Sequence, residues 1–186
     1  MSSSAISSSA ISRKRASIRR KLPHGLILRL GTTGDAPFIQ HVHEASIRGA
    51  PTGIYSRAEL ESWASALHMD RYIWAMNFNN ERFILADAVT GEGGRLAGFC
   101  SWRPDQIVGL YIHPAWAGCG VASVLMDQAE EAILAAAQPR LIHLAASALA
   151  RPFYEKRGYR VIRRRDWKTR GGLTMEAFDM EKPVRP

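Results

Sequence analysis

The sequence predicts a mixed α/β (α+β) fold in one domain, because candidate strands and candidate helices alternate along nearly the whole chain. The 186 residues, 46% of them apolar, are enough for one domain with a hydrophobic core. Apolar runs bounded by turn-forming residues mark seven candidate strands, at 26–30, 82–89, 95–102, 106–112, 141–146, 159–164 and 173–180. No apolar run approaches the roughly 18 residues of a membrane-spanning helix, so no membrane partner is expected.

The first predicted helix follows the strand at 26–30 and covers roughly Asp35–Arg48. Asp35 can serve as its N-cap, because a carboxylate accepts hydrogen bonds from the free N–H groups of a first turn. Pro37 falls inside that turn, where the missing N–H of proline costs no hydrogen bond.

The second predicted helix starts with a capping box, in which Ser56 and Glu59 can satisfy each other's backbone N–H groups. Apolar residues then recur at helical spacing, at Leu60, Trp63, Ala64 and Leu67. A short third helix is predicted at Asp70–Phe78. The next two strands, 82–89 and 95–102, are predicted to form a hairpin through the turn-forming segment Thr90–Gly94.

After the strand at 106–112 the sequence predicts an amphipathic helix from about Gly118 to Ala137. Residues four apart mark its apolar face: Val121, Leu125, Ala129 and Ile133. A further helix is predicted at Ala148–Arg157, where Gly158 can supply a left-handed cap.

The positive charge of the chain, +8 at pH 7, is concentrated near its amino terminus. Six of the 25 Lys and Arg residues lie within residues 1–24, which contain no acidic residue, and the remaining 19 nearly balance 17 acidic residues. Residues 1–24 therefore form a basic, Ser/Arg-rich tail before a nearly neutral domain at 25–186. This composition fits a disordered extension, a misplaced start or an organelle transit peptide. Nucleic acid is not the expected partner of a domain so nearly neutral.

Cys100 and Cys119 are the only cysteines, too few for a disulfide framework, so a reducing compartment is expected. We therefore expect a cytoplasmic protein, with targeting to an organelle through the basic tail as the alternative. No metal is expected, because His41 and His43 diverge on the predicted helix and no other histidine spacing suits a metal ion.

The clearest pattern for chemistry is GLYIHPAWAGCGVASVL (Gly109–Leu125), in which a strand, a small-residue loop and a helix follow one another. Such a junction leaves backbone N–H groups unpaired at the positive end of a helix dipole. Glycine lets an anion approach those groups, so the loop either binds phosphate or is an ordinary strand-to-helix turn. It has neither the Lys-Ser/Thr ending of a P-loop nor the dinucleotide GxGxxG spacing.

Three parts of the sequence resemble the GNAT superfamily of acetyl-CoA-dependent N-acetyltransferases. LYIHP (Leu110–Pro114) is similar to the family's strand, and the loop after it to the pyrophosphate loop Gln/Arg-x-x-Gly-x-Gly/Ala. Gly120 and Ala122 match that loop, whereas Ala117 replaces its Gln or Arg. Leu144–Val161 resembles the family's later strand-helix-strand segment with its Phe-Tyr-Glu-Lys-x-Gly-Tyr core. The amino-terminal part of the chain resembles one branch of the family, at Asp35-Ala36, Ser46–Gly49 and Tyr55–Trp63.

This resemblance covers roughly Leu26–Met180 and implies a GNAT-like single domain. Its sheet would be mixed, mostly antiparallel and six- to seven-stranded, flanked by helices and splayed between the strands at 106–112 and 141–146. Acetyl-CoA would be the co-substrate, with pantetheine in the gap and pyrophosphate on the loop. The implied cofactor-binding residues are Leu110, Tyr111, Ile112, Ala117, Gly118, Cys119, Gly120, Val121, Ala122 and Ser147.

The resemblance further implies direct transfer of an acetyl group to a primary amine of a small molecule or peptide, in a ternary complex. Tyr154 takes the place of the tyrosine that protonates the leaving thiolate, a role that suits a phenol with pKa near 10. Core packing beside Phe153 is its alternative role. The base stays open, because Gln106 stands where many relatives carry Glu. The candidates are Asp105, His113, Glu44 or a water.

The residues that could line the acceptor pocket are aromatic: Tyr55, Trp63, Trp74 and Trp102. Core packing is the better interpretation of Trp63. Many family members dimerise, so a homodimer is an open expectation. An acyl-CoA-binding regulatory module with little turnover is the alternative to an enzyme, favoured by Ala117 and Gln106. A nucleic-acid binder would use the tail and the basic run Arg160–Arg170, which a solvated edge strand explains more simply.

Overall fold

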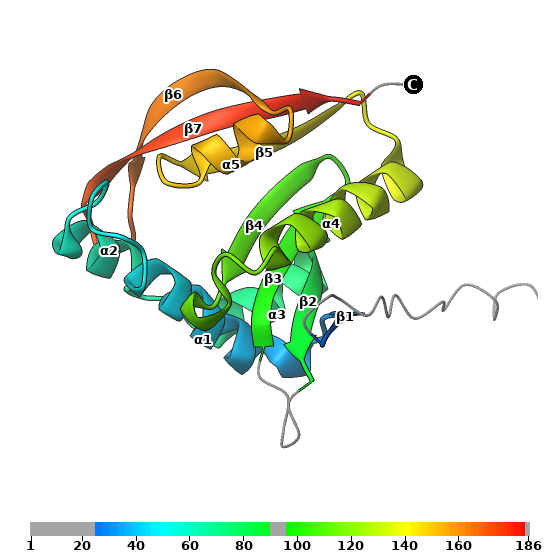
Figure 1. Cartoon of the computed structure of the whole chain (residues 1–186), viewed down its shortest axis with the longest axis horizontal. Helices are drawn as coiled ribbons and strands as arrows, with labels where there is room; N and C mark the ends of the chain where they lie inside the picture. The colour runs from blue at the N-terminus through cyan, green and yellow to red at the C-terminus, as the bar shows by residue number, and fades with distance from the viewer. Residues whose placement is uncertain (1–24, 90–95, 185–186) are drawn as a thin grey trace, which may run out of the picture.

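The computed structural model describes residues 25–89 and 96–184 (Figure 1). These residues form one seven-stranded sheet in the order β1-β2-β3-β4-β5-β7-β6. Its neighbouring strands run antiparallel except β4 and β5, which are parallel. The expected mixed, mostly antiparallel sheet flanked by helices is therefore confirmed. The predicted basic tail at 1–24 and the turn at Thr90–Gly94 lie outside the described residues.

The strands are β1 (Leu26–Leu30), β2 (Arg82–Ala88), β3 (Leu96–Arg103), β4 (Gln106–Ile112), β5 (Leu141–Ser147), β6 (Arg160–Lys168) and β7 (Thr174–Pro183). The helices are α1 (Ala36–Arg48), α2 (Arg57–Ala64), α3 (Met69–Phe78), α4 (Val121–Ala137) and α5 (Arg151–Lys156). Two short 3-10 turns, η2 (Thr33–Asp35) and η3 (Pro114–Trp116), precede α1 and α4. Among the described helices, none is both long and apolar enough to cross a membrane.

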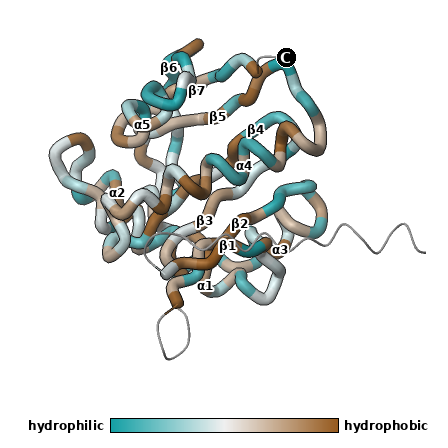
Figure 2. The backbone as a smooth tube through the Cα atoms, turned by 45° about the vertical axis from the view of Figure 1, so that its right-hand side comes forward, coloured by the Kyte–Doolittle hydropathy of each residue, from teal (hydrophilic) through white to brown (hydrophobic). Residues whose placement is uncertain are grey.

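Helices cover both faces of the amino-terminal half of the sheet. Successive residues of a strand point to opposite faces, so β2 contributes to two cores. Ile84 belongs to the core that contains Leu125 of α4. Phe83 and Leu85 belong to the core beneath α1 and α3. Burial on both faces explains why these strands read as continuous apolar runs rather than alternating ones (Figure 2).

The sheet opens between β4 and β5, as the resemblance implies. β4 is paired with β5 at only two residues, Gln106 and Ile107. Beyond them the two strands diverge, and β5, β7 and β6 lean away from the rest of the sheet (Figure 1). The gap exposes backbone groups of both strands, because neither has a partner strand on that side.

A β-bulge lies in β4 where the gap begins. Trp102 of β3 is opposite Ile107, but the preceding residue, Ser101, is opposite Gly109. Val108 is thus an extra residue that bends β4 away from β5.

Asp35 occupies the N-cap position of α1 as predicted, but its side chain does not cap the helix. Its carboxylate accepts hydrogen bonds from the Thr32 N–H and hydroxyl, at 2.8 and 2.9 Å, and pairs with Arg29 at 2.7 Å. The predicted starts of two other helices are wrong. α4 begins at Val121 rather than Gly118, because the two glycines before it have left-handed φ values of 76° and 79°. α5 begins at Arg151 rather than Ala148, after a turn closed by an N–H···O=C bond of 3.1 Å across 147–150.

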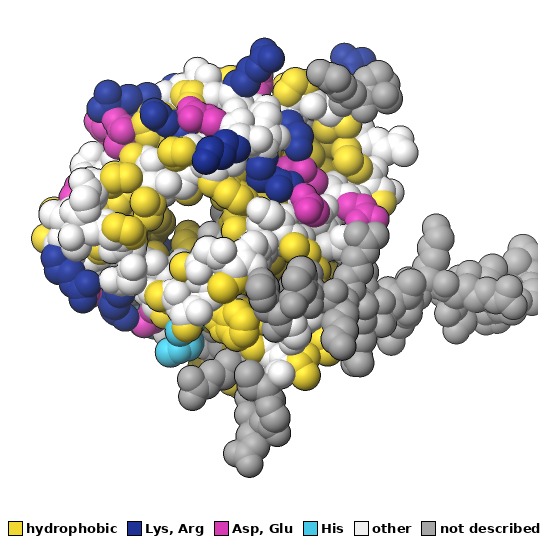
Figure 3. Space-filling model, viewed as in Figure 1, with side chains coloured by type: hydrophobic (Ala, Val, Ile, Leu, Met, Phe, Trp, Pro, Cys, Tyr) yellow, Lys and Arg dark blue, Asp and Glu magenta, His cyan; other side chains and the backbone are white. Residues whose placement is uncertain are grey.

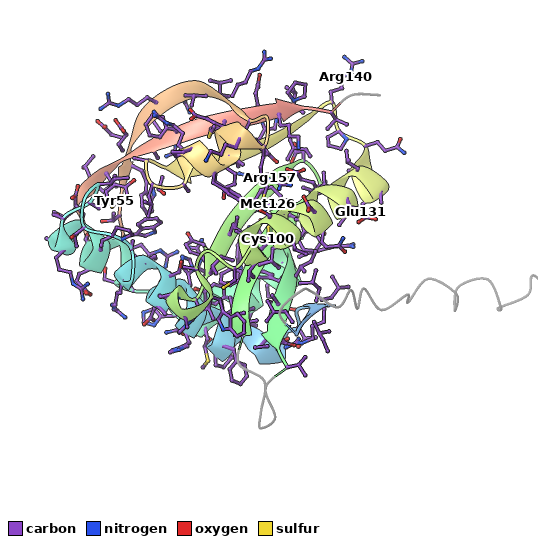
Figure 4. All side chains as sticks on the ribbon, in the orientation of Figure 1. Tyr55, Cys100, Met126, Glu131, Arg140 and Arg157 are labelled. Atoms are coloured by element: carbon purple, nitrogen blue, oxygen red, sulfur yellow. The ribbon has the colours of Figure 1, made fainter. Side chains whose placement is uncertain are left out.

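The carboxyl-terminal strands are held to α4 through one glutamate. The Glu130 carboxylate accepts hydrogen bonds from the Tyr159 hydroxyl at 3.0 Å and from the Lys182 ammonium at 2.8 Å. Arg157 extends from the end of α5 toward the same helix and pairs with Asp127 at 2.5 Å (Figure 4). These contacts lie on the far side of the gap from α2, so they hold the splayed half of the sheet in place.

Candidate active site

Two adjoining cavities occupy the region where β4 and β5 separate, and the space-filling surface is hollowed there (Figure 3). The smaller cavity, about 70 Å³, lies between Ile107–Tyr111 and Leu144–Ser147 and reaches Tyr154. We call it the slot. The larger cavity, about 190 Å³, extends from the slot toward α1, α2, β6 and β7. The residues that line both are Trp63, Val108, Tyr111, Ala145, Ala146 and Ser147.

The β4 wall of the slot presents backbone groups of alternate residues. The His113 N–H donates to the Ala97 carbonyl of β3 at 2.9 Å. Because backbone bonds alternate along an antiparallel pair, the backbone groups of Tyr111 also face β3, and those of Leu110 and Ile112 face the gap. Tyr111 contributes its ring, which lines both cavities.

The β5 wall ends at a link to the loop before α2. The Ala148 N–H donates to the Tyr55 hydroxyl at 2.7 Å, and Tyr55 lies beside the large cavity (Figure 4). The Ser147 hydroxyl accepts a hydrogen bond from the Ala150 N–H at 3.2 Å. Ser147 is therefore fixed at the point where strand, slot and large cavity meet.

The loop at Ala117–Ala122 presents a set of free donors at the start of α4. The Ala117 and Cys119 N–H groups are used within the loop, donating to the carbonyls of Pro114 and Trp116 at 3.1 and 3.4 Å. The other four N–H groups of the loop have no acceptor among the described residues: those of Gly118, Gly120, Val121 and Ala122. They stand at the amino end of a 17-residue helix, whose dipole favours an anion.

Tyr154 is buried, with 6% of its surface exposed, and lines the slot. Its ring packs edge-on against Phe153 and Tyr159, with ring centroids 5.3 and 5.8 Å away. Its hydroxyl has no hydrogen-bond partner among residues 25–89 and 96–184. Burial raises the pKa of this hydroxyl above its usual value of 10, so the phenol stays protonated and can donate.

The base candidates from the sequence do not line either cavity. The Glu44 carboxylate is occupied by Gln40 at 2.9 Å and Arg48 at 2.8 Å. The His113 ring accepts a hydrogen bond from the Ala115 N–H at 3.2 Å and stacks on another histidine. The third candidate, Asp105, directly precedes β4, which begins at Gln106.

His43 is a residue of the site that the sequence analysis did not identify. The residue is 6% exposed, and its imidazole lines the large cavity and packs against the Tyr111 ring at a tilt of 34°, with centroids 3.6 Å apart. Nδ1 is 2.9 Å from the Tyr72 hydroxyl, and the buried Nε2 has no partner among the described residues. Burial lowers the pKa of His43 to about 3, so the ring is neutral at pH 7. Its spacing of four residues from both Ile39 and Ile47 is the signal that places it on the buried face.

Two of the four aromatic residues predicted for the acceptor pocket line the large cavity. Trp63 does so, between the edges of the Tyr55 and Trp167 rings at 6.2 and 5.6 Å, and packing is its second role. The prediction is wrong for Trp74, which is 54% exposed on α3. It is also wrong for Trp102, which is 4% exposed and packs in the α4 core, on the opposite face of β3.

The described residues contain no group of three or more His, Cys, Asp or Glu arranged to hold a metal ion. The cleft offers a hydrogen-bonding slot, a helix start suited to phosphate and a buried phenol. Together these suit a long ligand with a phosphate group at one end and a reacting centre near Tyr154.

Comparison with known proteins identifies the family of this chain and structures of similar fold. Residues 52–182 match a family model described as an acetyltransferase (GNAT) domain. A GCN5-related N-acetyltransferase from Rhodopseudomonas palustris is 30% identical, with a TM-score of 0.72 over 84% of this chain and 94% of that one. No curated protein sequence matches the chain.

Two more distant structures share the fold. The PaiA N-acetyltransferase from Thermoplasma acidophilum, in complex with coenzyme A, is 20% identical, with a TM-score of 0.64 over 86% of this chain and 99% of that one. YncA from Salmonella typhimurium, with its cofactor acetyl-CoA, is 15% identical, with a TM-score of 0.61 over 87% of this chain and 95% of that one.

Proposed function

Because this chain belongs to the acetyltransferase (GNAT) family, we propose that it transfers an acetyl group from acetyl-CoA directly to a primary amine of a small molecule or peptide. The observation that carries the proposal is the slot between β4 and β5 with the four free N–H groups of the α4 loop. Coenzyme A and acetyl-CoA in two structures of the same fold support the choice of cofactor.

In the proposed complex the pantetheine arm lies in the slot, as a third strand-like partner for the two splayed strands. The backbone groups of Leu110 and Ile112 face it from β4, and Ser147 ends its β5 side. The pyrophosphate binds the N–H groups of Gly118 and Gly120 with those of the first α4 residues. Ala117 and Cys119, whose N–H groups are already bonded, shape the loop instead of contacting phosphate.

The proposed chemistry places the thioester where the slot meets the large cavity. The amine attacks the thioester carbonyl, the C–N bond forms, and the C–S bond breaks to leave a thiolate. Tyr154 gives its hydroxyl proton to that thiolate, which its protonated state and free hydroxyl favour. The proton of the amine leaves to water on the side of the large cavity. A pKa near 3 makes His43 a poor base, so it serves as a hydrogen-bonding group.

An acyl-CoA-binding regulatory module with little turnover is the second candidate function. The observation that favours it is the absence of Asp105, His113 and Glu44 from the lining of both described cavities. The two candidates agree on acetyl-CoA binding and differ on turnover.

Two measurements test both candidates. Acetyl-CoA should raise the melting temperature, since ligand at 100 times its dissociation constant stabilises the folded state by about 2.7 kcal/mol. No stabilisation would contradict both functions. Release of free CoA with any member of a broad amine panel supports the enzyme, and stabilisation without release across that panel supports the regulatory module.

A further inference from the structure

The large cavity carries a positive charge that acetyl transfer does not itself require. Arginines from three different segments line it: Arg71 at the start of α3, Arg165 in β6 and Arg170 in the turn after β6. The carboxylate among its lining residues is Glu176, which is itself paired with Arg164. The excess of guanidinium groups over carboxylates predicts that an anion binds here.

Two of these three arginines are free to bind an anion. Arg165 is paired with Asp179 at 2.7 Å, a carboxylate that it shares with Arg163. Across the described residues, neither Arg71 nor Arg170 forms an ion pair with a carboxylate. Arg170 donates to the Ala66 carbonyl at 3.3 Å, a contact that orients its guanidinium without neutralising it.

Arg170 is held at the cavity by the turn that follows it. The Gly171 N–H donates to the Ser62 carbonyl of α2 at 3.1 Å, and the Thr169 hydroxyl is 2.6 Å from the Ser62 hydroxyl. A Cβ at Gly171 would lie 2.5 Å from the Ser62 hydroxyl oxygen, so glycine permits the close approach. The turn is thereby docked on α2, which places Arg170 at the cavity while its side chain stays exposed to solvent.

The inner end of the cavity adds an unpaired polar group. Nε2 of His43 is buried, no described residue hydrogen-bonds to it, and the ring lines the cavity. Burial lowers the pKa of His43 most, and the positive charges of Arg71 and Arg170 lower it further. At about 190 Å³ the space is below the roughly 300–1,000 Å³ of pockets for drug-sized ligands, so it suits a small molecule.

We propose that the acceptor is a small amine that also carries an anionic group, a carboxylate or a phosphate, bound by Arg71 and Arg170. Guanidinium groups bind both anions through paired hydrogen bonds. The amine would then point toward Val108 and Ala146, where the large cavity meets the slot. This proposal deepens the proposed function and rests on it.

The test uses matched amines that differ only in the anionic group, with CoA release as the readout. Propylamine is paired with 4-aminobutanoate, phenethylamine with phenylalanine, and ethanolamine with O-phosphoethanolamine. We expect kcat/KM to be about 10- to 100-fold higher for the anionic member of at least one pair, as charge-assisted hydrogen bonds contribute. The pair that shows the preference separates a carboxylate from a phosphate.

Arg71→Met and Arg170→Met should raise KM for the anionic member about tenfold or more and leave KM for its neutral partner unchanged. Arg160→Met, an exposed arginine at the start of β6 outside the cavity, should change neither value. Turnover of neutral amines at least equal to that of the anionic ones would overturn this inference and leave the acetyltransferase function standing.

Binding gives a readout that does not need turnover. In the presence of CoA, the preferred anionic amine should raise the melting temperature of the wild type and not that of Arg71→Met. If no amine releases CoA but this shift is seen, the transfer function fails and the anion site stands. No shift with any anionic amine, together with no preference in turnover, overturns the anion site.

Discussion

The hydroxyl of Tyr55 accepts a hydrogen bond from the backbone N–H of Ala148 at 2.7 Å, joining residues 93 positions apart. Tyr55 belongs to the loop before α2 and is buried, whereas Ala148 follows the last residue of β5. The bond crosses the open side of the sheet, where β5 has lost its pairing with β4. It therefore sets how far the amino-terminal helices stand from the splayed half.

We expect Tyr55→Phe to lower the free energy of unfolding by about 1–3 kcal/mol, because it leaves a partly buried N–H without its acceptor. Urea unfolding at pH 7 measures this change. Tyr154→Phe is the matched control, since it removes a buried hydroxyl that has no partner in the described part of the chain. Equal losses of stability in the two variants would contradict the role given to the Tyr55 hydroxyl.

The same Tyr154→Phe variant should be impaired in turnover. If Tyr154 protonates the leaving thiolate, kcat should fall about 10²- to 10⁴-fold, the usual contribution of a general acid. The dissociation constant for acetyl-CoA, measured by calorimetry, should stay within a factor of three or so, because the phenol donates only in the transition state. An unchanged kcat would show that Tyr154 is a packing residue of the slot.

Local patterns in the sequence account for most of the fold. The capping box before α2 forms as predicted: the Glu59 carboxylate accepts from the Ser56 N–H at 2.7 Å, and the Glu59 N–H donates to the Ser56 hydroxyl at 3.2 Å. Gly158 ends α5 with a φ of 88°, as its position after the helix predicts. Such features depend on residues a few positions apart, so the sequence determines them directly.

The acceptor side of the site depends on contacts between distant residues, which the sequence pattern does not contain. Trp63 and Trp102 are equally aromatic, yet only Trp63 reaches the cavity. The strand register directs Trp102 to the α4 face. In the sequence Arg170 belongs to a basic run that predicts a solvated strand. Its place at the cavity depends on a contact of the following turn with Ser62, more than 100 residues earlier. The family resemblance predicted the slot between β4 and β5. The juxtaposition of Arg71 and Arg170 is seen only in the folded chain.

Gly120→Ala should weaken acetyl-CoA binding more than it weakens the fold. Gly120 has a φ of 79°, and an alanine there costs about 1–2 kcal/mol in a left-handed conformation, or shifts the loop. A shift would misdirect the free N–H groups, so we expect the dissociation constant, measured by calorimetry, to rise about tenfold or more. Gly158 has a similar φ of 88° but lies away from the loop. Gly158→Ala should therefore lower stability without changing the dissociation constant for acetyl-CoA. Equal effects of both variants on binding would argue against phosphate binding at this loop.

His43 should make the folded state less stable in acid. Its pKa is about 3 in the folded chain, against 6.5 without burial, so between these values the unfolded chain binds a proton that the folded chain does not. Stability contributed by the neutral ring is complete above pH 6.5 and declines as pH falls toward 3, by at most about 1.4 kcal/mol per pH unit. Urea unfolding between pH 7 and pH 5 avoids most carboxylate titration.

His43→Phe removes the titrating ring, so its free energy of unfolding should change less between pH 7 and pH 5 than that of the wild type, even if it is lower throughout. Tyr72→Phe removes the hydroxyl 2.9 Å from Nδ1 but keeps the buried imidazole. It should be less stable than the wild type and retain the wild-type slope. A His43→Phe protein with the full wild-type slope would place the acid sensitivity elsewhere, and would leave the unpartnered Nε2 as a binding group only.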